Sequence, residues 1–518
     1  MGVEHGETDM LSQQPAAKFT FVDLFAGIGG FHAALAELGG RCVYAAEKDR
    51  SAADVYRKAW PTDDGDGFEF TEDINDDVEP IDDLTTLEQL ARMAAEGRGT
   101  ISENVPRDFD VLAAGFPCQT FSKSGQQKGV LDRTRGTLFY NILRIVAERK
   151  PKIVFLENVR NLVGPRHRET TFVTIVDALQ ALGYEVSREP TLISPHRIPP
   201  KMGGGPQIRE RVYILAIRAD LVADRGQTEP FPGFEYPDFW DPKTSWNITE
   251  TELLDGAPAV ITDKWLDASC SNSRAERLRE LRTVTEQHSV VGAEWLTAWE
   301  GLLTEVVRRR GLTSGSGRPT FPGRPIWFAV VDKEWEKVQR CEADARDQPW
   351  KHEFLDHSLR FVAEYKDEIH ASKLCDRVLG LHNSWRKLEW QAGDATSLDE
   401  CLIQLRPSGV RVKRATYTPA LVAINQTPIL GSERRRLTQY EAGRLQGFKD
   451  NVYEAMRDLG QTPAECYKQF GNAVHVGAVK YGLTQFMHYY FKADGPTDPG
   501  LRSLWNGCLA SPASRPVE

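Results

Sequence analysis

The sequence predicts an α/β protein built around a doubly wound, mostly parallel sheet. Five short apolar runs alternate with stretches of helical character, which is typical of a parallel sheet covered by helices on both sides. The runs are continuously apolar, as expected for strands that are buried on both faces. A glycine-rich turn follows the first run and indicates a ligand pocket at the carboxyl ends of the strands.

The expected strands follow one another along the first part of the chain. Their ranges are 19–25, 41–47, 109–115, 152–158 and 211–217. From about residue 219 the pattern changes to tryptophan-rich segments of mixed charge, and helical stretches return near residue 418. We therefore expect an N-terminal tail at 1–17, an α/β domain at 18–218, a smaller middle domain at 219–417, the rest of the α/β domain at 418–492 and a loosely attached C-terminal tail at 493–518.

The composition excludes several classes of protein. The 518 residues include no apolar run near the roughly 18 residues of a membrane span, and the N-terminus lacks a secretory signal. We therefore expect a soluble, cytoplasmic protein with no membrane contact. The eight cysteines form no CxxC pair, so neither a metal site nor a disulfide framework is expected. The net charge of −10 argues against general nucleic-acid affinity but leaves room for a local basic surface.

The turn after the first strand indicates a nucleotide-like pocket. Gly27, Gly29 and Gly30 occupy this turn, and Glu47 ends the second strand, where a carboxylate can accept hydrogen bonds from both hydroxyls of a ribose. The spacing is GxGG rather than GxGxxG, which favours S-adenosylmethionine over a dinucleotide. Asp73 is placed to meet an adenine if a third strand ends there. A purely structural turn and a site for NAD or FAD are the alternatives.

Reactive side chains lie at the ends of other expected strands. Cys118 lies in a loop of Gly, Pro and Ser just after the third run, which favours a reactive thiolate over an inert core cysteine. Glu157 ends an otherwise apolar strand, which is costly unless the carboxyl has a partner or a function. Gln207, Arg209 and Arg211 alternate into the last strand and therefore share one face. Surface-exposed arginines are the alternative reading of this last pattern.

Seven motifs occur in a fixed order along the chain. They are DLFAGIGG, GFPCQTFSKSG, DRTRGTLF, FLENV, QIRER, RRLTQYEAGRLQGF and GNAV. This set resembles the DNA (cytosine-5) methyltransferase family over residues 19–217 and about 418–485. The resemblance implies a Rossmann-like, S-adenosylmethionine-dependent methyltransferase domain that is divided around a target-recognition domain at 219–417. It also implies a sequence-specific bacterial enzyme of the restriction-modification kind, which acts on double-stranded DNA without a metal.

The resemblance assigns the catalytic roles. Cys118 would attack ring carbon 6 of a flipped-out cytosine, Glu157 would donate a hydrogen bond to ring nitrogen 3, and Arg211, supported by Arg209, would hold the ring oxygen. A cytosine inside a duplex must leave the stack before this attack. Donation requires the protonated form of Glu157, so we predict that burial raises its pKa. The base that removes the proton from carbon 5 is not identified by the sequence.

The resemblance also assigns the cofactor site, whose product would be S-adenosylhomocysteine. Phe25 would cover the adenine face, Glu47 would bind the ribose, and Asp73 and Ile74 would bind the adenine. The remaining cofactor residues would be Ala26, Gly27, Ile28, Gly29, Gly30, Pro117, Leu138, Asn472, Ala473 and Val474. The chain departs from the family pattern at Trp60, where Asn is common, at His475, where Pro is frequent, and in the long glycine-rich segment before Gln207.

DNA contacts are expected from two segments. Gln119, Ser122 and Ser124 belong to the Cys118 loop and would bond to phosphate or to the orphaned guanine. A basic stretch could form a phosphate-binding wall together with the arginines at 434–436. Its members are Arg406, Arg411, Lys413 and Arg414. A solvated loop and a solvated basic face are the alternatives, and the 219–417 region contains no known base-reading motif.

Three other functions compete with DNA methylation. A transfer-RNA cytosine methyltransferase could share these motifs, but the large middle domain argues against it. A non-catalytic nucleic-acid-binding regulator would not need Cys118, Glu157 and Arg211, so the presence of all three argues against this function. A nicotinamide oxidoreductase would require a different glycine spacing. We expect a monomer, with a restriction endonuclease of the same specificity as its candidate functional partner.

Overall fold

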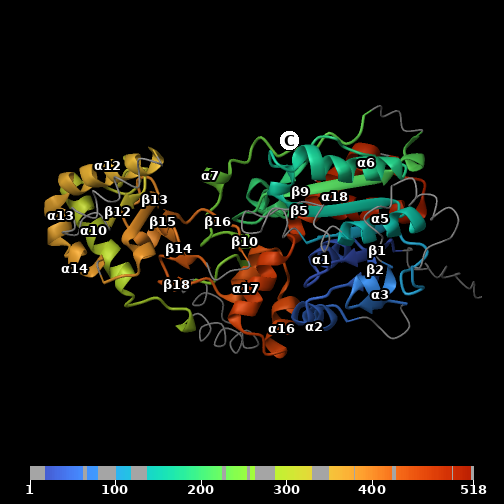
Figure 1. Ribbon diagram of the computed structural model, residues 1–518, viewed down its shortest axis with the longest axis horizontal. Helices are drawn as coiled ribbons and strands as arrows, with labels where there is room; N and C mark the ends of the chain where they lie inside the picture. The colour runs from blue at the N-terminus through green and yellow to red at the C-terminus, as the bar shows by residue number, and fades with distance from the viewer. Residues whose placement is uncertain are drawn as a thin grey trace, which may run out of the picture.

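The protein consists of two bodies that lie side by side in the computed structural model (Figure 1). The first contains an eight-stranded sheet and the second a six-stranded sheet. The structure describes residues 18–61, 67–79, 101–117, 137–223, 229–253, 257–262, 286–328, 349–378, 380–422, 427–492 and 494–514.

The larger sheet has the strand order β3-β2-β1-β4-β5-β9-β6, and β7 also pairs with β9. Its strands are β1 (Thr20–Leu24), β2 (Arg41–Ala46), β3 (Glu69–Thr71), β4 (Val111–Ala114), β5 (Ile153–Val159), β6 (Tyr184–Val186), β7 (Leu192–Ile193) and β9 (Arg211–Arg218). Strands β1 to β5 are parallel, whereas β9 is antiparallel to β5. The predicted α/β class is confirmed, and each of the five expected strands forms.

Helices cover both faces of this sheet. They are α1 (Gly30–Glu37), α2 (Arg50–Ala59), α3 (Ile74–Asp77), α5 (Thr137–Arg149), α6 (Val173–Ala181), α18 (Val476–Tyr490) and α19 (Pro499–Ala510). Successive strand residues alternate between two apolar clusters, because neighbouring side chains of a strand point to opposite faces. Phe155 packs in the cluster that contains α1 and α18 residues, and Val154 packs in the cluster that contains α5 and α6 residues. This burial of both faces explains the continuous apolar runs.

The end of the chain is not loosely attached, contrary to our expectation. Helix α19 buries Leu501, Leu504, Trp505 and Cys508 in the same cluster as α1 and α18. Asp498 caps the first turn of α19 by accepting a hydrogen bond from the Leu501 N–H. The same carboxylate forms a 2.6 Å ion pair with Lys152 Nζ. Proline is well tolerated at the first position of a helix, so Pro499 begins the element instead of preventing it.

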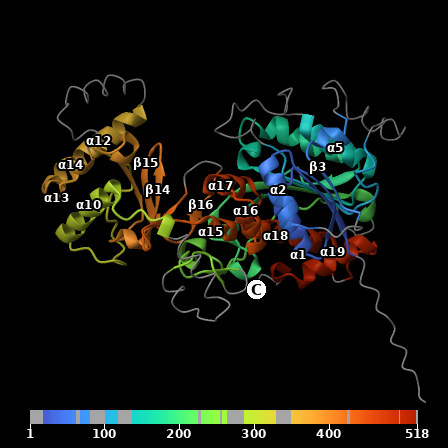
Figure 2. The ribbon, with the colours of Figure 1, turned by 90° about the horizontal axis from the view of Figure 1, so that it is seen from below.

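The second body has its own apolar core. Its helices are α10 (Glu294–Arg310), α12 (Pro349–Glu364), α13 (Lys366–Ala371) and α14 (Leu374–Val378). Its sheet has the order β12 (Ile326–Trp327), β13 (Lys387–Gln391), β15 (Gly409–Arg414), β14 (Cys401–Arg406), β17 (Ile429–Leu430) and β18 (Arg435–Arg436). Trp299 and Trp390 both belong to the apolar core between them. Figures 1 and 2 show the helices on the outer side and the strands on the side of the first body.

Two segments belong to a different body from the one that the expected domain boundaries assign to them. Residues 429–436 form β17 and β18 of the second sheet, although they follow the expected boundary at 417. Phe231, Ile248 and Val260 pack in the apolar cluster of the first body, although they follow the boundary at 219. The reason is packing: the Phe231 ring meets Phe486 of α18 edge-on at 5.5 Å, which covers an apolar helix face.

Candidate active site

The turn between β1 and α1 adopts a backbone that favours glycine. Gly27 and Gly29 have φ angles of 55° and 86°, and the Ala26 N–H donates to the Ala46 carbonyl at the end of β2. A side chain at Gly27 would meet nothing within 4 Å, whereas one at Gly29 or Gly30 would collide with its neighbours. The open side of the turn is therefore at Gly27, and the other two glycines permit close packing.

Glu47 faces this turn from the end of β2. Its Oε2 accepts a 2.8 Å hydrogen bond from the Gly27 N–H, and its Oε1 accepts one of 2.7 Å from the Asp49 N–H. Each carboxylate oxygen has further acceptor capacity, so the fixed carboxylate can still bind the two hydroxyls of a ribose. Burial raises the pKa of Glu47, and the two N–H donors oppose that shift.

The third strand ends just before Asp73. β3 ends at Thr71, and Asp73 caps α3 by accepting a hydrogen bond from the Asn75 N–H. Burial raises the pKa of Asp73, but hydrogen bonds from Lys48 and Asn75 outweigh it and hold the pKa below its usual value. Ile74 is buried in the apolar cluster on the α5 side of the sheet.

The other residues of the predicted cofactor set have different environments. Phe25 is half-buried with a φ of 55°, Leu138 lies in the first turn of α5, and Pro117 is exposed beyond β4. Asn472 is the exposed last residue of α17 (Pro463–Asn472). Val474 contacts both the turn and β4, because its methyl groups lie 2.6 Å and 3.6 Å from the positions of a Cβ on Gly30 and on Gly115. Val474 thus packs against the turn, while the contact of residues 472–474 with the cofactor stays a prediction.

The sequence analysis missed the support behind the turn. Trp60 Nε1 donates a 3.1 Å hydrogen bond to the Ile28 carbonyl, and its ring stacks on His32 with centroids 4.6 Å apart. The indole fills the space that a side chain at Gly29 would need, with Nε1 2.2 Å from that Cβ position. At the position where the family commonly has Asn, Trp60 therefore supplies a side chain that supports the turn. Its departure from the family pattern was the available signal.

Glu157 and Arg211 meet at the carboxyl end of β5. Arg211 Nε lies 3.1 Å from Glu157 Oε1, and the Glu157 side chain is 10% exposed. Burial raises the pKa of Glu157, as predicted, while the nearby Arg211 and Arg209 guanidinium groups oppose the shift. Glu157 Oε2 lies 3.9 Å from the position of a Cβ on Gly115, so the carboxyl borders the end of β4.

Arg209 hydrogen-bonds to the main chain, whereas Arg211 pairs with Glu157. Its guanidinium donates to three main-chain carbonyls, those of Leu421 at 3.1 Å, Gly471 at 2.9 Å and Ala473 at 2.7 Å. Gln207 similarly donates to the Leu445 carbonyl and accepts from the Leu421 N–H, both at 3.0 Å. These two buried side chains tie β8 (Gln207–Ile208) and the segment after it to the C-terminal part of the first body. Arg209 is thus a positioning residue.

Cys118, Gln119, Ser122 and Ser124 lie outside the described residues. The chain immediately before them is held at the edge of the sheet that carries Glu157, because Asn158 Nδ2 donates a 3.4 Å hydrogen bond to the Phe116 carbonyl. Asn158 follows Glu157 directly in β5. The end of β4 and the Glu157 carboxyl are therefore fixed side by side.

Comparison with known proteins identifies the family. A model of the C-5 cytosine-specific DNA methylase family matches residues 19–487. The chain belongs to this family. Among its relatives, the type II methyltransferase M.AluI of Cellulosimicrobium cellulans is 37% identical over 517 aligned residues, which cover 90% of this chain and 92% of that protein.

Two further similarities are more limited. The type II methyltransferase M.HhaI of Haemophilus parahaemolyticus is 37% identical over 201 residues, covering 39% of this chain and 50% of that protein. The crystal structure of a mutant DNMT2 from Spodoptera frugiperda is 16% identical, with a TM-score of 0.39 and coverage of 89% and 97%. The family is that of S-adenosylmethionine-dependent DNA (cytosine-5) methyltransferases.

The basic residues that this DNA methylase was expected to use for phosphate are mostly paired with carboxylates. Arg411 contacts Glu389 at 2.9 Å, and Arg406 lies 4.0 Å from the same carboxyl. Arg414 contacts Asp394 and Glu400. Lys413 instead lies 3.9 Å from the centroid of the Tyr417 ring, and burial lowers its pKa to about 8. The stretch is therefore less available as a simple phosphate-binding wall than its sequence indicates.

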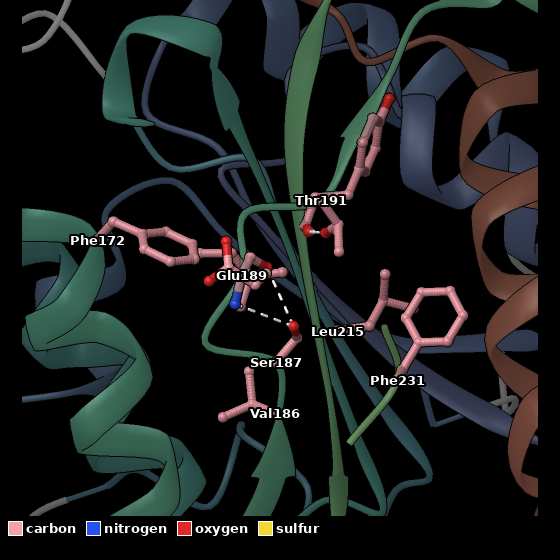
Figure 3. Close-up of a pocket in the computed structure, with 9 residues that line it drawn as sticks. Phe172, Val186, Ser187, Glu189, Thr191, Leu215 and Phe231 are labelled. Carbon is pink, nitrogen blue, oxygen red and sulfur yellow. Dashed lines mark hydrogen bonds between the residues drawn. The ribbon is translucent and has the colours of Figure 1, made fainter. Parts of the chain in front are cut away.

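A separate pocket lies beside β9 of the methylase fold (Figure 3). Its lining residues are Phe172, Val186, Ser187, Glu189, Thr191, Tyr213, Ile214, Leu215 and Phe231. None of them belongs to the predicted cofactor or catalytic set. Within the described parts of the chain, no helix could cross a membrane and no group of His, Cys, Asp and Glu is arranged to hold a metal ion.

Proposed function

We propose that this protein transfers a methyl group from S-adenosylmethionine to carbon 5 of a flipped-out cytosine in double-stranded DNA, through a covalent Cys118 adduct. The observation that carries the proposal is the buried Glu157 carboxyl, which lies 3.1 Å from Arg211 at the edge of the sheet where the cofactor turn opens. A carboxyl with a raised pKa at this place is suited to donate a hydrogen bond to a cytosine ring.

The residues present fit S-adenosylmethionine. Glu47 would bind the ribose, Asp73 the adenine amino group, and Phe25 the adenine face. The open side of Gly27 and the segment at Asn472 would receive the amino-acid part. Support comes from the fixed Glu47 carboxylate and from the free space in front of Gly27. When bound, the cofactor supplies an electrophilic methyl group.

The protein's own groups would make the cytosine reactive. The Cys118 thiolate forms a bond to ring carbon 6, and the displaced electron pair makes carbon 5 nucleophilic. Protonated Glu157 donates to ring nitrogen 3 and so stabilises the developing charge, while Arg211 holds the ring oxygen. After methylation, loss of the carbon 5 proton lets the electron pair return and expel the Cys118 thiolate. Gln119, Ser122 and Ser124 would contact the DNA around the vacated position.

The two bodies would have different functions. We assign methyl transfer to the first body and target recognition to the second, whose sheet lies on the side of the first body. The basic residues Arg406, Arg411, Lys413 and Arg414 would contact DNA from there. We further propose that the protein acts in the cytoplasm as a monomer, and that it protects DNA from a restriction endonuclease of the same specificity. Support for this role comes from type II relatives such as M.AluI.

Bisulfite sequencing of DNA from cells that express the protein tests this function. We expect one short sequence motif to be methylated at a single cytosine, and no such methylation with the Cys118→Ala variant. A parallel assay should compare methyl transfer to duplex DNA with transfer to transfer RNA. Transfer to RNA alone, or methylation that persists in the Cys118→Ala variant, would contradict the proposal.

A further inference from the structure

Three polar side chains of the second body form a row across adjacent strands. Glu389 of β13 is the direct partner of Arg411 of β15, which in turn is the direct partner of Gln404 of β14. Directly paired residues project from the same face of a sheet, so the three side chains lie next to one another. We call them the polar row.

The opposite face of the same strands forms the core of the second body. Leu388, Ile403, Val410 and Val412 alternate with the polar row and are buried in the cluster that contains α10 and α12 residues. The polar row therefore faces away from these helices. Leu402, two positions before Gln404 and so on its face, packs in the apolar cluster of the first body. The polar row therefore lies on the face of the sheet that packs against the first body at Leu402. Figures 1 and 2 show the strands of this sheet on the side of the first body.

The ion pair within the row orients Arg411 without using all its donors. Arg411 Nη2 lies 2.9 Å from Glu389 Oε1, and the Arg411 side chain remains 28% exposed. A guanidinium has five N–H donors, so others remain for a ligand. Arg411 Nε is buried and has no hydrogen-bond acceptor among the described residues, so the donors open to a ligand are those of the two Nη atoms. The neighbouring Gln404 side chain is only 7% exposed.

The charge of this surface distinguishes two kinds of DNA contact. A phosphate-binding wall needs uncompensated positive charge. Here Glu389 neutralises Arg411 at 2.9 Å and also approaches Arg406 at 4.0 Å. Base edges, in contrast, present donors and acceptors that an oriented guanidinium, amide and carboxylate can distinguish. The polar row therefore suits bases better than phosphates.

We propose that the polar row reads base edges in the major groove of the DNA target, and that Arg411 contacts a guanine there. Glu389 is a positioning residue that fixes the Arg411 guanidinium from one side, and the buried Gln404 lies beside it on the other side. This inference rests on the proposed function, because it takes duplex DNA as the substrate. It revises the expectation that Arg411 binds phosphate.

A library of duplexes with randomised sequence tests the proposal, with methylated products identified by bisulfite sequencing. The Arg411→Lys variant keeps the positive charge but loses the planar fork that binds a guanine edge. We expect its preference for one guanine of the target to fall roughly 5- to 150-fold, with the other positions unchanged. The salt dependence of DNA binding should stay the same. Arg360→Ala is the matched control, since Arg360 is an exposed arginine of α12 on the outer side.

The outcomes separate this inference from the proposed function. A uniform loss of methylation on all sequences in Arg411→Lys, or an unchanged guanine preference, would overturn base reading by Arg411. A wild-type protein that methylates no duplex would instead overturn the proposed function. If Arg411→Lys fails to fold, Glu389→Gln decides the matter. This variant should weaken the same guanine preference, because the amide no longer pairs with the Arg411 guanidinium, and retention of full specificity would contradict the inference.

Discussion

At the scale of single residues, Glu157 experiences two opposing effects. Burial penalises its charged form and raises its pKa, while Arg211 at 3.1 Å favours the charged form. Burial prevails, so the protonated carboxyl persists to higher pH than an exposed glutamate would allow. That is the form required to donate a hydrogen bond to a cytosine ring.

This balance predicts a pH dependence. The protonated form of Glu157 is active, so kcat/KM for methyl transfer should fall as pH rises through the raised pKa of Glu157. Glu157→Gln should lower the rate by roughly 10²- to 10⁴-fold and abolish this alkaline decrease, because an amide does not titrate. Rate profiles of both proteins check the prediction. An identical alkaline decrease in the variant would assign that limb to another group.

Glu47 gives a second prediction at this scale. Glu47→Ala removes the acceptor for the ribose hydroxyls and also frees the Gly27 and Asp49 N–H groups. We expect S-adenosylmethionine binding to weaken by about 1.5 to 3 kcal/mol in calorimetry. Glu72→Ala is the control, since this exposed carboxylate lies beside Asp73 but pairs with Arg57. Equal affinities of the two variants would remove Glu47 from the cofactor site.

At the scale of elements, the glycine turn between β1 and α1 depends on a contact with the end of α2. The hydrogen bond from Trp60 Nε1 to the Ile28 carbonyl holds the turn from behind. Trp60→Phe keeps the ring stacked near His32 but removes the donor. We expect a loss of about 1 kcal/mol in cofactor binding.

Trp299→Phe is a matched control for this prediction. It removes an indole hydrogen bond of the same length, 3.1 Å to the Trp385 carbonyl, in the second body. Cofactor affinity should be unchanged in the Trp299→Phe protein. If both variants lose the same affinity, the effect is a general loss of stability and Trp60 has no specific role at the turn.

The elements also explain why some predictions succeeded. Some features depend only on residues that are close in sequence, namely the glycine turn, Glu47 and the strand that ends before Asp73. Their positions in the fold could therefore be predicted from their spacing along the chain. The role of Arg209 could not be predicted in this way. Its acceptors, the carbonyls of Leu421, Gly471 and Ala473, are more than 200 residues away in sequence. Only the folded chain brings them together.

At the scale of the whole molecule, packing rather than composition decides where each segment belongs. Gly, Pro and Ser near the C-terminus resembled a loose tail, but α19 buries four side chains in the first body. Likewise, the change of composition near residue 219 did not mark the start of the second body, because Phe231 covers α18. Apolar contacts between distant segments leave no local signature in the sequence.

Removal of residues 494–518 tests the importance of the C-terminal helix. The deletion removes Leu501, Leu504 and Trp505 from the core and leaves the Lys152 side chain without Asp498. Each large apolar side chain contributes roughly 1.5 to 3 kcal/mol, so a decrease of several degrees or more in the Tm is expected. A deletion of 515–518 is the control. An unchanged Tm in the longer deletion would show that α19 does not stabilise the first body.

The covalent step is tested most directly with a duplex that carries 5-fluorocytosine at the target. Fluorine cannot leave as a proton does, so after methyl transfer the enzyme should remain bonded to the DNA. Burial raises the pKa of Cys401, Cys466 and Cys508 to about 12, so these thiols are poor nucleophiles. We predict an adduct that survives denaturing electrophoresis, requires S-adenosylmethionine and disappears in Cys118→Ser. An adduct that persists in Cys118→Ser, or that maps to another cysteine, would contradict this prediction.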